Sequence, residues 1–530
     1  MVMLLKTKLA LINEAVQVSG TNIAGMLSTE PTVEEALAKL INAYTTIHAG
    51  YVAKYERYKA SVDGTPIKTR SLPDFMKIDN HINNSFMSEI VDTKQGYMIG
   101  IPVAYTVQNQ TLHEKEKSDA ELKAEQFKLN AMSNKVKAFI EANNIHDLNM
   151  DTIKMMSICG TSSRLCYLAG STPDIQADVR VVNIEPWETI FIYNVTGTEI
   201  IAAIRYYRLW TIESGMARYR TQAEVYDSQF IYYFKEQGLS FTDPFETGST
   251  LSVVKFVFSA EEPMNPRPHI FGRVPLIEYA NNKERQGDCD KVLSLIDAYD
   301  RSVSDLSSEL EQFRLAYIAL YGLKAEKEDI DKLRQTGMFE MTKDGKIEFI
   351  TKKLDIDGIM KYFNRLENNI VRFAKSVNFK DENFYGNLSG VAIRYKLMQL
   401  EEKAMTTQVK FEVADKAMWK VLERATAIRS TFFDSTLIKR QFTRNIPVNM
   451  LEEARIQTEL EGKVSTKTRL GVASFIENPG LEAQALDEER ISNKAKGIEF
   501  STGQTPVARM VDIESGGPVE RNTNGTIQDI

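Results

Sequence analysis

Apolar residues recur in alternating steps of four and three between residues 292 and 313. The members of this stripe are Val292, Ile296, Tyr299, Val303, Leu306, Leu310 and Phe313. The spacing predicts a helix, within 283–313, that packs lengthwise against another helix. From residue 288 to 313 its other faces carry seven acids against two bases, a net charge of about −5. The acids are Asp288, Asp290, Asp297, Asp300, Asp305, Glu309 and Glu311, and the bases are Lys291 and Arg301.

A second helix with the same spacing is predicted to begin near Asp355. Its stripe consists of Ile359, Phe363, Leu366, Ile370, Phe373 and Val377. The intervening residues predict a small mixed segment. Its parts are a strand at 315–322, a charged helix near 324–336, and a hairpin at 339–350 that turns at Asp344-Gly345. We therefore expect two neighbouring helical rods with a compact α/β insert at one end.

A third helix follows a polar break at 378–388. Its apolar positions, from Leu397 to Ile428, keep one register for about forty residues, which is roughly 60 Å of helix. Three shorter helices are predicted near 449–462, 466–476 and 480–496. The last thirty residues are rich in Gly, Ser, Thr, Pro and Asn, a composition typical of disorder.

The first half of the chain predicts a mixture of helices and strands. A helix is expected at 31–60, with Pro31 at its start, and a charged helix at 114–143. Between them, 77–105 predicts a helix followed by a strand through Tyr97–Thr106. Residues 157–260 contain aromatic and β-branched runs separated by turn residues, which indicates an antiparallel β region. The fold class is therefore α+β.

Composition narrows the class of protein. A chain of 530 residues is too long to fold around a single hydrophobic core, so several structural regions are expected. The net charge of −7 argues against bulk attraction to nucleic acid or to anionic membranes. The three cysteines form no CxxC pair, which predicts neither a disulfide framework nor a zinc ribbon. No apolar run reaches membrane-spanning length, and Lys6 and Lys8 interrupt any signal-type core at the N-terminus.

The motifs of common catalytic and cofactor sites are missing from the sequence. There is no GxxxxGK[ST], HExxH or GxSxG, so we predict no catalytic residue, no metal and no cofactor. Two DxD triplets, at 288–290 and 355–357, also fit helix N-termini, where carboxylates complement the helix dipole. Residues 379–385 combine aromatic residues with Lys380 and would suit base stacking, although a plain linker is the simpler interpretation.

Four segments, taken in order, resemble one protein family. Residues 77–105 contain an Asn-bearing helix, then IVDTKQGY and GIPVAY. Residues 274–313 contain PLIEYANN, then a glycine–aspartate pair and LIDAYDRSVSD. Residues 385–404 contain GNLSGVAIRYK, and 442–470 contain FTRNIPVN and GKVSTKTRL. Together they resemble the portal proteins of tailed double-stranded DNA bacteriophages.

The resemblance implies a dodecameric ring at one capsid vertex, with a central channel for DNA packaging and ejection. It also implies a division of the subunit into wing, stem, clip, tunnel loop and crown. The implied boundaries are 1–282 for the N-terminal wing, 283–313 and 354–377 for the stem helices, 314–353 for the clip, 378–388 for the tunnel loop, 389–430 for the long wing helix, 431–497 for the helical crown and 498–530 for a disordered tail.

The resemblance further implies partners and a location. Besides itself, the expected partners are the large terminase subunit, a head–tail connector protein, and the major capsid and scaffolding proteins, with double-stranded DNA passing through the channel and no membrane. The protein would be made in the host cytoplasm and would end in the virion, at the portal vertex. Within the tunnel loop, the residues expected to face DNA are Lys380, Asn383, Tyr385 and Asn387.

The charge pattern suits a conduit for DNA. Each tight Lys/Arg–phosphate contact would have to break for DNA to advance, whereas an acidic wall repels phosphate. Twelve copies at −7 would give the ring about −84. We expect Asp297, Asp300, Asp305 and Glu309 to contribute to that wall. Two other functions stay open from the sequence: a DNA-binding protein that uses the 455–470 helix pair, and a coiled-coil structural scaffold.

Overall fold

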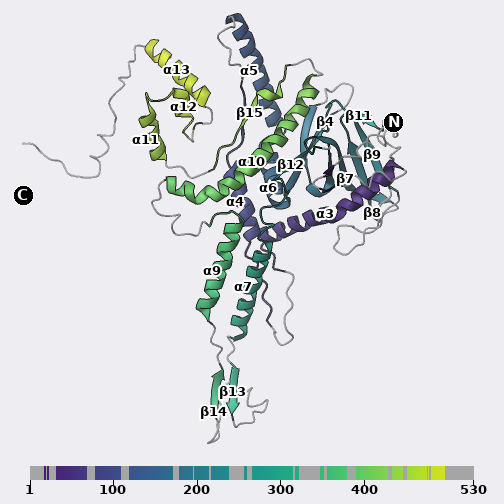
Figure 1. Cartoon of the computed structure of the whole chain (residues 1–530), viewed down its shortest axis with the longest axis vertical. Helices are drawn as coiled ribbons and strands as arrows, with labels where there is room; N and C mark the ends of the chain where they lie inside the picture. Colours follow the sequence, from purple (N-terminus) through teal and green to yellow (C-terminus); the bar gives the residue numbers. More distant parts are fainter. Residues whose placement is uncertain are drawn as a thin grey trace, which may run out of the picture. The chain divides into compact units, whose positions relative to one another are not determined.

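The computed structural model describes most of the chain (Figure 1). The described residues are 17–18, 21–22, 32–67, 78–108, 119–170, 178–194, 196–213, 216–237, 256–258, 265–313, 317–321, 346–350, 355–378, 390–427, 432–445, 450–473, 476 and 479–495. The chain divides into two compact units, residues 1–446 and 447–530.

The larger sheet is an antiparallel meander. Its described strands lie in the order β10-β9-β8-β7-β6-β1-β2, with β11 beside β9. They are β1 (Gln17–Val18), β2 (Thr21–Asn22), β6 (Thr189–Tyr193), β7 (Ile200–Glu213), β8 (Met216–Tyr226), β9 (Phe230–Glu236), β10 (Phe256–Phe258) and β11 (Arg267–Pro268). The antiparallel β region predicted from aromatic and β-branched runs is confirmed.

Helix α3 (Val33–Val62) covers one face of this sheet. Thr32 caps the helix by accepting a hydrogen bond from the Glu35 amide at 3.2 Å, as N-caps do. Leu40 and Ile41 of α3 are buried together with Ile190 and Ile204 of the sheet. The helix predicted at 31–60 is therefore confirmed, and its apolar stripe is the surface that packs on the strands.

A second sheet and the long helix α10 (Gly390–Ala427) share another core. The sheet order is β12 (Leu276–Ala280), β4 (Thr161–Ala169), β5 (Asp178–Ile184), with helices α5 (Asp119–Ala142) and α6 (Ile145–Cys159) before it in the chain. Phe411 of α10 is fully buried, and its ring lies 5.2 Å from that of Tyr279 on β12. Helix α6 and strand β12 were not predicted, and the last residues of α6, 157–159, fall within the range that the sequence assigns to the β region.

The strand predicted at Tyr97–Thr106 begins later in the structure. Helix α4 (Phe86–Ile99) runs through Gly96 and Tyr97, and strand β3 (Ala104–Val107) pairs instead with β15 (Ile438–Gln441). Tyr97 is buried with Leu400 and Ala404 of α10. This tertiary burial outweighs the low helix propensity of Gly96, so the aromatic run that resembles a strand is helical.

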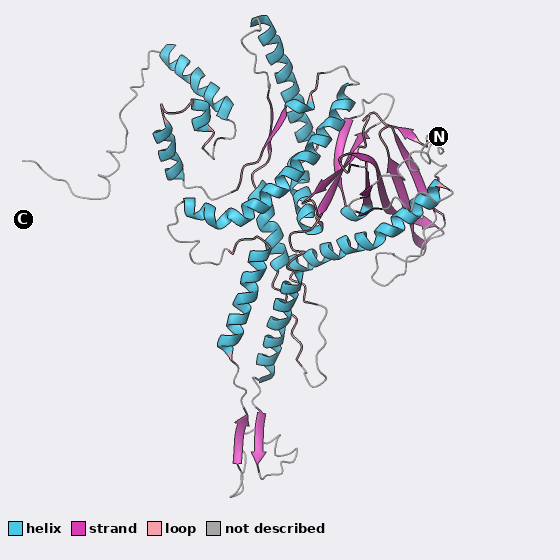
Figure 2. Ribbon diagram, viewed as in Figure 1, coloured by secondary structure: helices cyan, strands magenta, loops and turns pink. Residues whose placement is uncertain are grey.

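The two predicted rods are α7 (Leu293–Phe313) and α9 (Ile356–Phe373), which lie side by side and lead to two strands (Figure 2). Strand β13 (Tyr317–Tyr321) pairs antiparallel with β14 (Lys346–Ile350). Residues 346–350, which we expected to pair within the 339–350 hairpin, thus pair with the earlier strand. The charged helix expected near 324–336 and the turn at Asp344-Gly345 lie outside the described residues.

The described residues of the C-terminal unit form three helices, as predicted. They are α11 (Met450–Leu460), α12 (Thr466–Leu470) and α13 (Pro479–Ala495). Ser465 caps α12 by accepting a hydrogen bond from the Thr468 amide at 3.2 Å. Gln457 of α11 donates to the carbonyl of Arg469 at 2.9 Å, which ties α11 to α12.

His48 makes the packing of α3 on the larger sheet sensitive to pH. Its ring is buried, stacks on Tyr206 of β7 and hydrogen-bonds the Tyr206 hydroxyl. Burial lowers the pKa of His48 from 6.5 to about 4. Between these values the unfolded chain binds a proton that the folded chain refuses, so folding stability falls as the pH falls.

We predict that the wild-type protein loses about 3 kcal/mol more stability than His48→Gln between pH 7 and pH 4. Urea unfolding of the unassembled protein at several pH values, followed by far-UV circular dichroism, measures this difference. Parallel pH dependences for the two proteins would contradict the assignment.

Candidate functional site: the α7–α9 hairpin and its base

Helices α7 and α9 pack along their predicted stripes. Val292, Ile296 and Ile370 are at most 4% exposed, and the rings of Tyr299 and Phe363 lie 5.5 Å apart. The stripes differ from prediction in two places, since Leu310 is 50% exposed and Phe373 is 51% exposed.

Straight helical geometry explains the exposure of Phe373. At 3.6 residues per turn, position 374 follows 370 on the buried face, whereas a strict heptad would select 373. The structure accordingly buries Ala374 to 2% exposure. The sequence pattern therefore located the contact surface of α9 correctly, except in its last turn.

The extended segment 78–85 runs along a second face of α7. The amides of Asn80 and Ile82 donate to the hydroxyls of Ser308 and Ser304, both at 2.9 Å. The Asn84 amide donates to Asp300 at 3.1 Å. Two extended residues advance about 6.8 Å and four helical residues about 6 Å, so alternate amides meet successive turns of α7.

Helix α3 contacts the start of α7 and the turn before it with two cations. Arg57 donates to the carboxylate of Asp297, and Lys54 lies 2.7 Å from the carboxylate of Asp290. The side chain of Asp297 is half-exposed, whereas that of Asp290 is largely covered. Helix α3 thus holds the first turn of α7 and the residues just before it, in addition to the packing of α7 on α9.

A buried charge cluster joins the base of the hairpin to α4 and α10. Lys94 of α4 and Asp288, just before α7, have side chains 0% and 2% exposed, with an N–O distance of 3.1 Å. Asn281 accepts hydrogen bonds from Lys94 at 2.7 Å and from Thr407 of α10 at 2.8 Å. Lys403 of α10 is 3.7 Å from Asp288. We call Lys94, Asn281, Asp288, Lys403 and Thr407 the base cluster.

Both charges of the central pair are present at neutral pH. Burial lowers the pKa of Lys94 to about 8, and the charge of Asp288 opposes that shift. Burial alone would raise the pKa of Asp288, but the charges of Lys403 and Lys94 outweigh it and hold the pKa below its usual value. Two cations thus surround one anion in a dry site, where removing one partner is costly.

Close backbone contacts seat Asp288 in this position. The Asp288 amide donates to the carbonyl of Ser157 at 2.7 Å, and the Asn281 amide donates to that of Gly160 at 2.9 Å. A Cβ at Gly287 would lie 2.3 Å from the carbonyl oxygen of Ile158. Only glycine fits this approach, which places the base cluster directly against the end of α6.

A second polar cluster lies one turn further along α4. Tyr97 donates to Glu401 of α10 at 2.6 Å, and Arg444 contacts the same carboxylate at 2.8 and 3.0 Å. The Asn445 amide donates to the Tyr97 carbonyl at 3.1 Å. Residues from widely separated parts of the chain thus converge on α4.

The four predicted wall acids occupy different environments on α7. Asp300 is 4% exposed and accepts two hydrogen bonds from Asn84; burial raises its pKa, and those bonds oppose the shift. Asp297 faces Arg57. Asp305 is exposed and Glu309 is partly exposed. The predicted tunnel-loop residues Lys380, Asn383, Tyr385 and Asn387 lie outside the described residues.

The second DxD triplet and the 455–470 helix pair have structural roles in the fold. Asp355 caps α9 by accepting a hydrogen bond from the Gly358 amide at 3.0 Å, so this DxD triplet is a helix start. Across the described ranges, no group of three or more His, Cys, Asp or Glu side chains is placed to hold a metal ion. Residues 455–470 form parts of α11 and α12 joined by a turn in which Gly462 has φ +74°.

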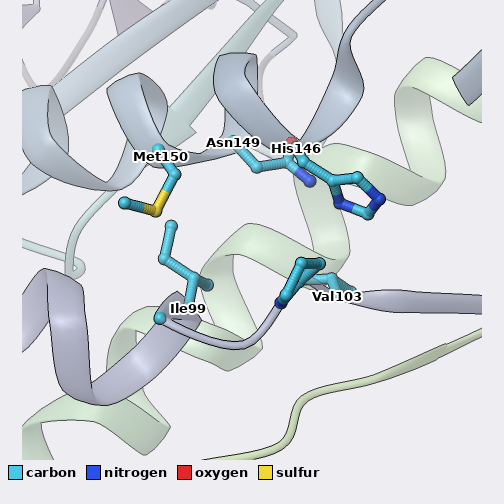
Figure 3. A pocket seen from close by; sticks show the side chains of 7 residues that line it. Ile99, Val103, His146, Asn149 and Met150 are labelled. Atoms are coloured by element: carbon cyan, nitrogen blue, oxygen red, sulfur yellow. The ribbon is translucent and has the colours of Figure 1, made fainter. Parts of the chain in front are cut away.

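A small pocket beside α6 contains no set of groups that could perform catalysis (Figure 3). It measures about 240 Å³, and its side chains come from the end of α4, the following loop and α6. Ile99, Val103 and Met150 make it largely apolar. Asn149 is already engaged, since it accepts a hydrogen bond from Arg164 at 3.1 Å.

Comparison with known proteins identifies the family. The sequence profile described as "Phage portal protein, SPP1 Gp6-like" matches residues 37–496. The chain belongs to this family of phage portal proteins. It is 23% identical over 437 residues to the portal protein of Bacillus phage SPP1, which covers 79% of this chain and 78% of that protein. It is 24% identical over 445 residues to the portal protein of Clostridium phage phiCD119, and this match covers 81% of this chain and 89% of that protein.

The resemblance found in the sequence is confirmed, and portal proteins are structural rather than catalytic. The segments that carried the resemblance also meet in space. Lys94 belongs to IVDTKQGY, Asp288 to the glycine–aspartate pair, and Glu401 and Arg444 to the two later segments. Among the described helices, every one is too short or too polar to span a bilayer.

We predict that Lys94→Met destabilises the unassembled subunit by about 3 kcal/mol, because Asp288 loses its nearest cation in a dry site. Lys94→Met combined with Asp288→Asn should cost at least about 1 kcal/mol less than the sum of the single changes. Lys375→Met, at the half-exposed Lys375–Glu402 pair on the surface, serves as the control and should cost under about 1 kcal/mol. Urea unfolding measures all four variants, and additive effects would argue against the base cluster as one unit.

Proposed function

We propose that this portal protein assembles as a dodecameric ring at one capsid vertex and forms the channel through which DNA is packaged and ejected. Family membership supports a portal role. The observation that carries the proposal is the α7–α9 hairpin, an acidic two-helix rod fixed at one end by the base cluster and continued at the other by β13 and β14.

The subunit regions are part of the same proposal. The stem comprises 283–313 and 354–377, the clip 314–353 and the tunnel loop 378–388. The wing comprises 1–282 and the long helix 389–430, and the crown comprises 431–497. The packing of α7 on α9, and the pairing of β13 with β14, support a stem that leads into a clip.

The proposed partners follow from these regions. The clip docks the large terminase subunit during packaging and a head–tail connector protein afterwards, while the outer regions meet the major capsid and scaffolding proteins. The protein is made in the host cytoplasm and resides in the virion. The tunnel loop places Lys380, Asn383, Tyr385 and Asn387 toward DNA.

The exposed carboxylates of α7 give the channel wall its charge. Asp305 is exposed and Glu309 is partly exposed, so both can act on a passing phosphate backbone. Asp300 and Asp297 contribute to the net charge while holding segment 78–85 and Arg57. An acidic wall avoids the salt-dependent phosphate contacts that would hold DNA in place.

Native mass spectrometry of the full chain tests the assembly. A ring of about twelve 60.1 kDa subunits is expected. A dimer or trimer would favour a coiled-coil scaffold. A monomer that binds DNA tightly in a gel shift at physiological salt would favour DNA binding through α11 and α12.

We predict that Asp305→Asn with Glu309→Gln preserves the ring but slows DNA passage. Amides remove the repulsion between the wall and phosphate without adding a cation. An in vitro packaging assay with purified proheads and terminase measures the rate. Gln126→Ala on exposed α5 is the matched control. Packaging at the wild-type rate by the amide variant would contradict the role of the wall.

A further inference from the structure

Helix α10 carries a second apolar stripe on the side that faces away from its own core. The members of this outer stripe are Tyr395, Met398, Met405, Val409 and Val413. Each is between 47% and 74% exposed. At about 100° per residue they fall within an arc of about 80°, and the buried Leu400, Ala404 and Phe411 lie roughly opposite. The core of the subunit therefore accounts for one face of α10 and leaves the opposite face apolar and exposed.

The outer stripe has the spacing of a surface that packs against another helix. From Tyr395 to Val413 it advances in steps of three and four residues, with Glu402 as the one polar member of the series, over about 27 Å. A helix that is apolar on opposite faces is normally covered on both. Contiguous exposed apolar side chains mark surfaces that meet another protein.

The outer stripe begins beside the base of the α7–α9 hairpin. Val377, just after α9, is buried together with Leu400 of α10. Lys403 of α10 donates to the carbonyl of Ala374, the residue after the end of α9, at 2.9 Å. Figure 1 shows this part of α10 next to the same end of α9. The first turns of the outer stripe are thus fixed to the hairpin that forms the stem in the proposed ring.

We propose that the outer stripe of α10 packs against a neighbouring copy of this chain. The inference rests on the proposed ring and names a surface through which adjacent subunits hold together. In such a ring every hairpin base has another copy on either side, which makes a neighbouring copy the nearest protein surface. In a closed ring of more than two copies the contact is head-to-tail, so the outer stripe meets a different surface of the next copy.

The chemistry of the outer stripe suits a protein neighbour rather than DNA. Its one polar member, Glu402, is acidic and lies 3.0 Å from Lys375. The stripe therefore offers no unpaired cation to phosphate. Further along the same arc of α10, Lys416 and Lys420 are exposed. The apolar surface is thus limited to the part of α10 nearer the hairpin, where the neighbouring copy stands.

Lysines placed in the outer stripe test the contact. We expect Met405→Lys with Val409→Lys to abolish the ring, because two charges per copy would be buried without partners at every interface. Both side chains are about half exposed in the subunit, so the urea midpoint of the unassembled variant should match that of the wild type. Native mass spectrometry measures assembly. Phe127→Lys on α5, at a side chain 76% exposed, is the matched control and should form rings.

Photo-cross-linking identifies what covers the outer stripe. With benzoylphenylalanine in place of Met405, irradiated rings should yield a covalent product of twice the 60.1 kDa subunit mass. Unassembled subunits at low concentration should not yield it, and neither should rings that carry the same group in place of Phe127. Mass spectrometry of peptides from the product then locates the receiving surface on the next copy.

The outcomes separate the possible failures. Rings of wild-type stability from Met405→Lys with Val409→Lys would overturn the inference. A lowered urea midpoint of this variant, with cross-links confined to one chain, would show that the chain covers its own stripe. Normal rings that fail to enter proheads would assign the stripe to a capsid protein instead. These three results leave the proposed function standing, whereas absence of rings from the wild type would overturn the proposed function itself.

Discussion

The α7–α9 hairpin depends on one buried ion pair at its base. Lys94 and Asp288 are almost fully buried; Asn281 hydrogen-bonds both, Lys403 lies 3.7 Å from Asp288, and Thr407 donates to Asn281. Buried charges give little net stability over apolar residues, but they tolerate few alternative geometries. The base cluster therefore fixes where α7 begins relative to α4 and α10. The position of the α7–α9 hairpin depends on that starting point.

Beyond the base cluster, helix α7 has three faces with different surroundings. One face packs on α9, a second receives the amides of segment 78–85, and the third carries exposed carboxylates. The first two faces hold α7 in place within the subunit, and the exposed carboxylate of Asp305 lies on the third. In the proposed ring, the same helix therefore serves packing within the subunit and carries charge on the channel wall.

The spacing of apolar residues along the chain predicted the long helices well, because heptad spacing indicates which face of a helix is buried. It located α7, α9, α10 and the antiparallel strands. It could not predict that Asp300 is covered by segment 78–85, or that β14 pairs with β13, because both depend on contacts between distant parts of the chain. The base cluster could not be predicted for the same reason: Lys94 and Asp288 belong to separate segments of the sequence, and only folding brings them together.

A cryo-electron microscopy map of the assembled full-length protein tests the central claim most directly. We expect a closed ring in which α7–α9 hairpins stand side by side around a central channel. A ring whose channel is not bounded by these hairpins, or an assembly without a channel, would contradict it.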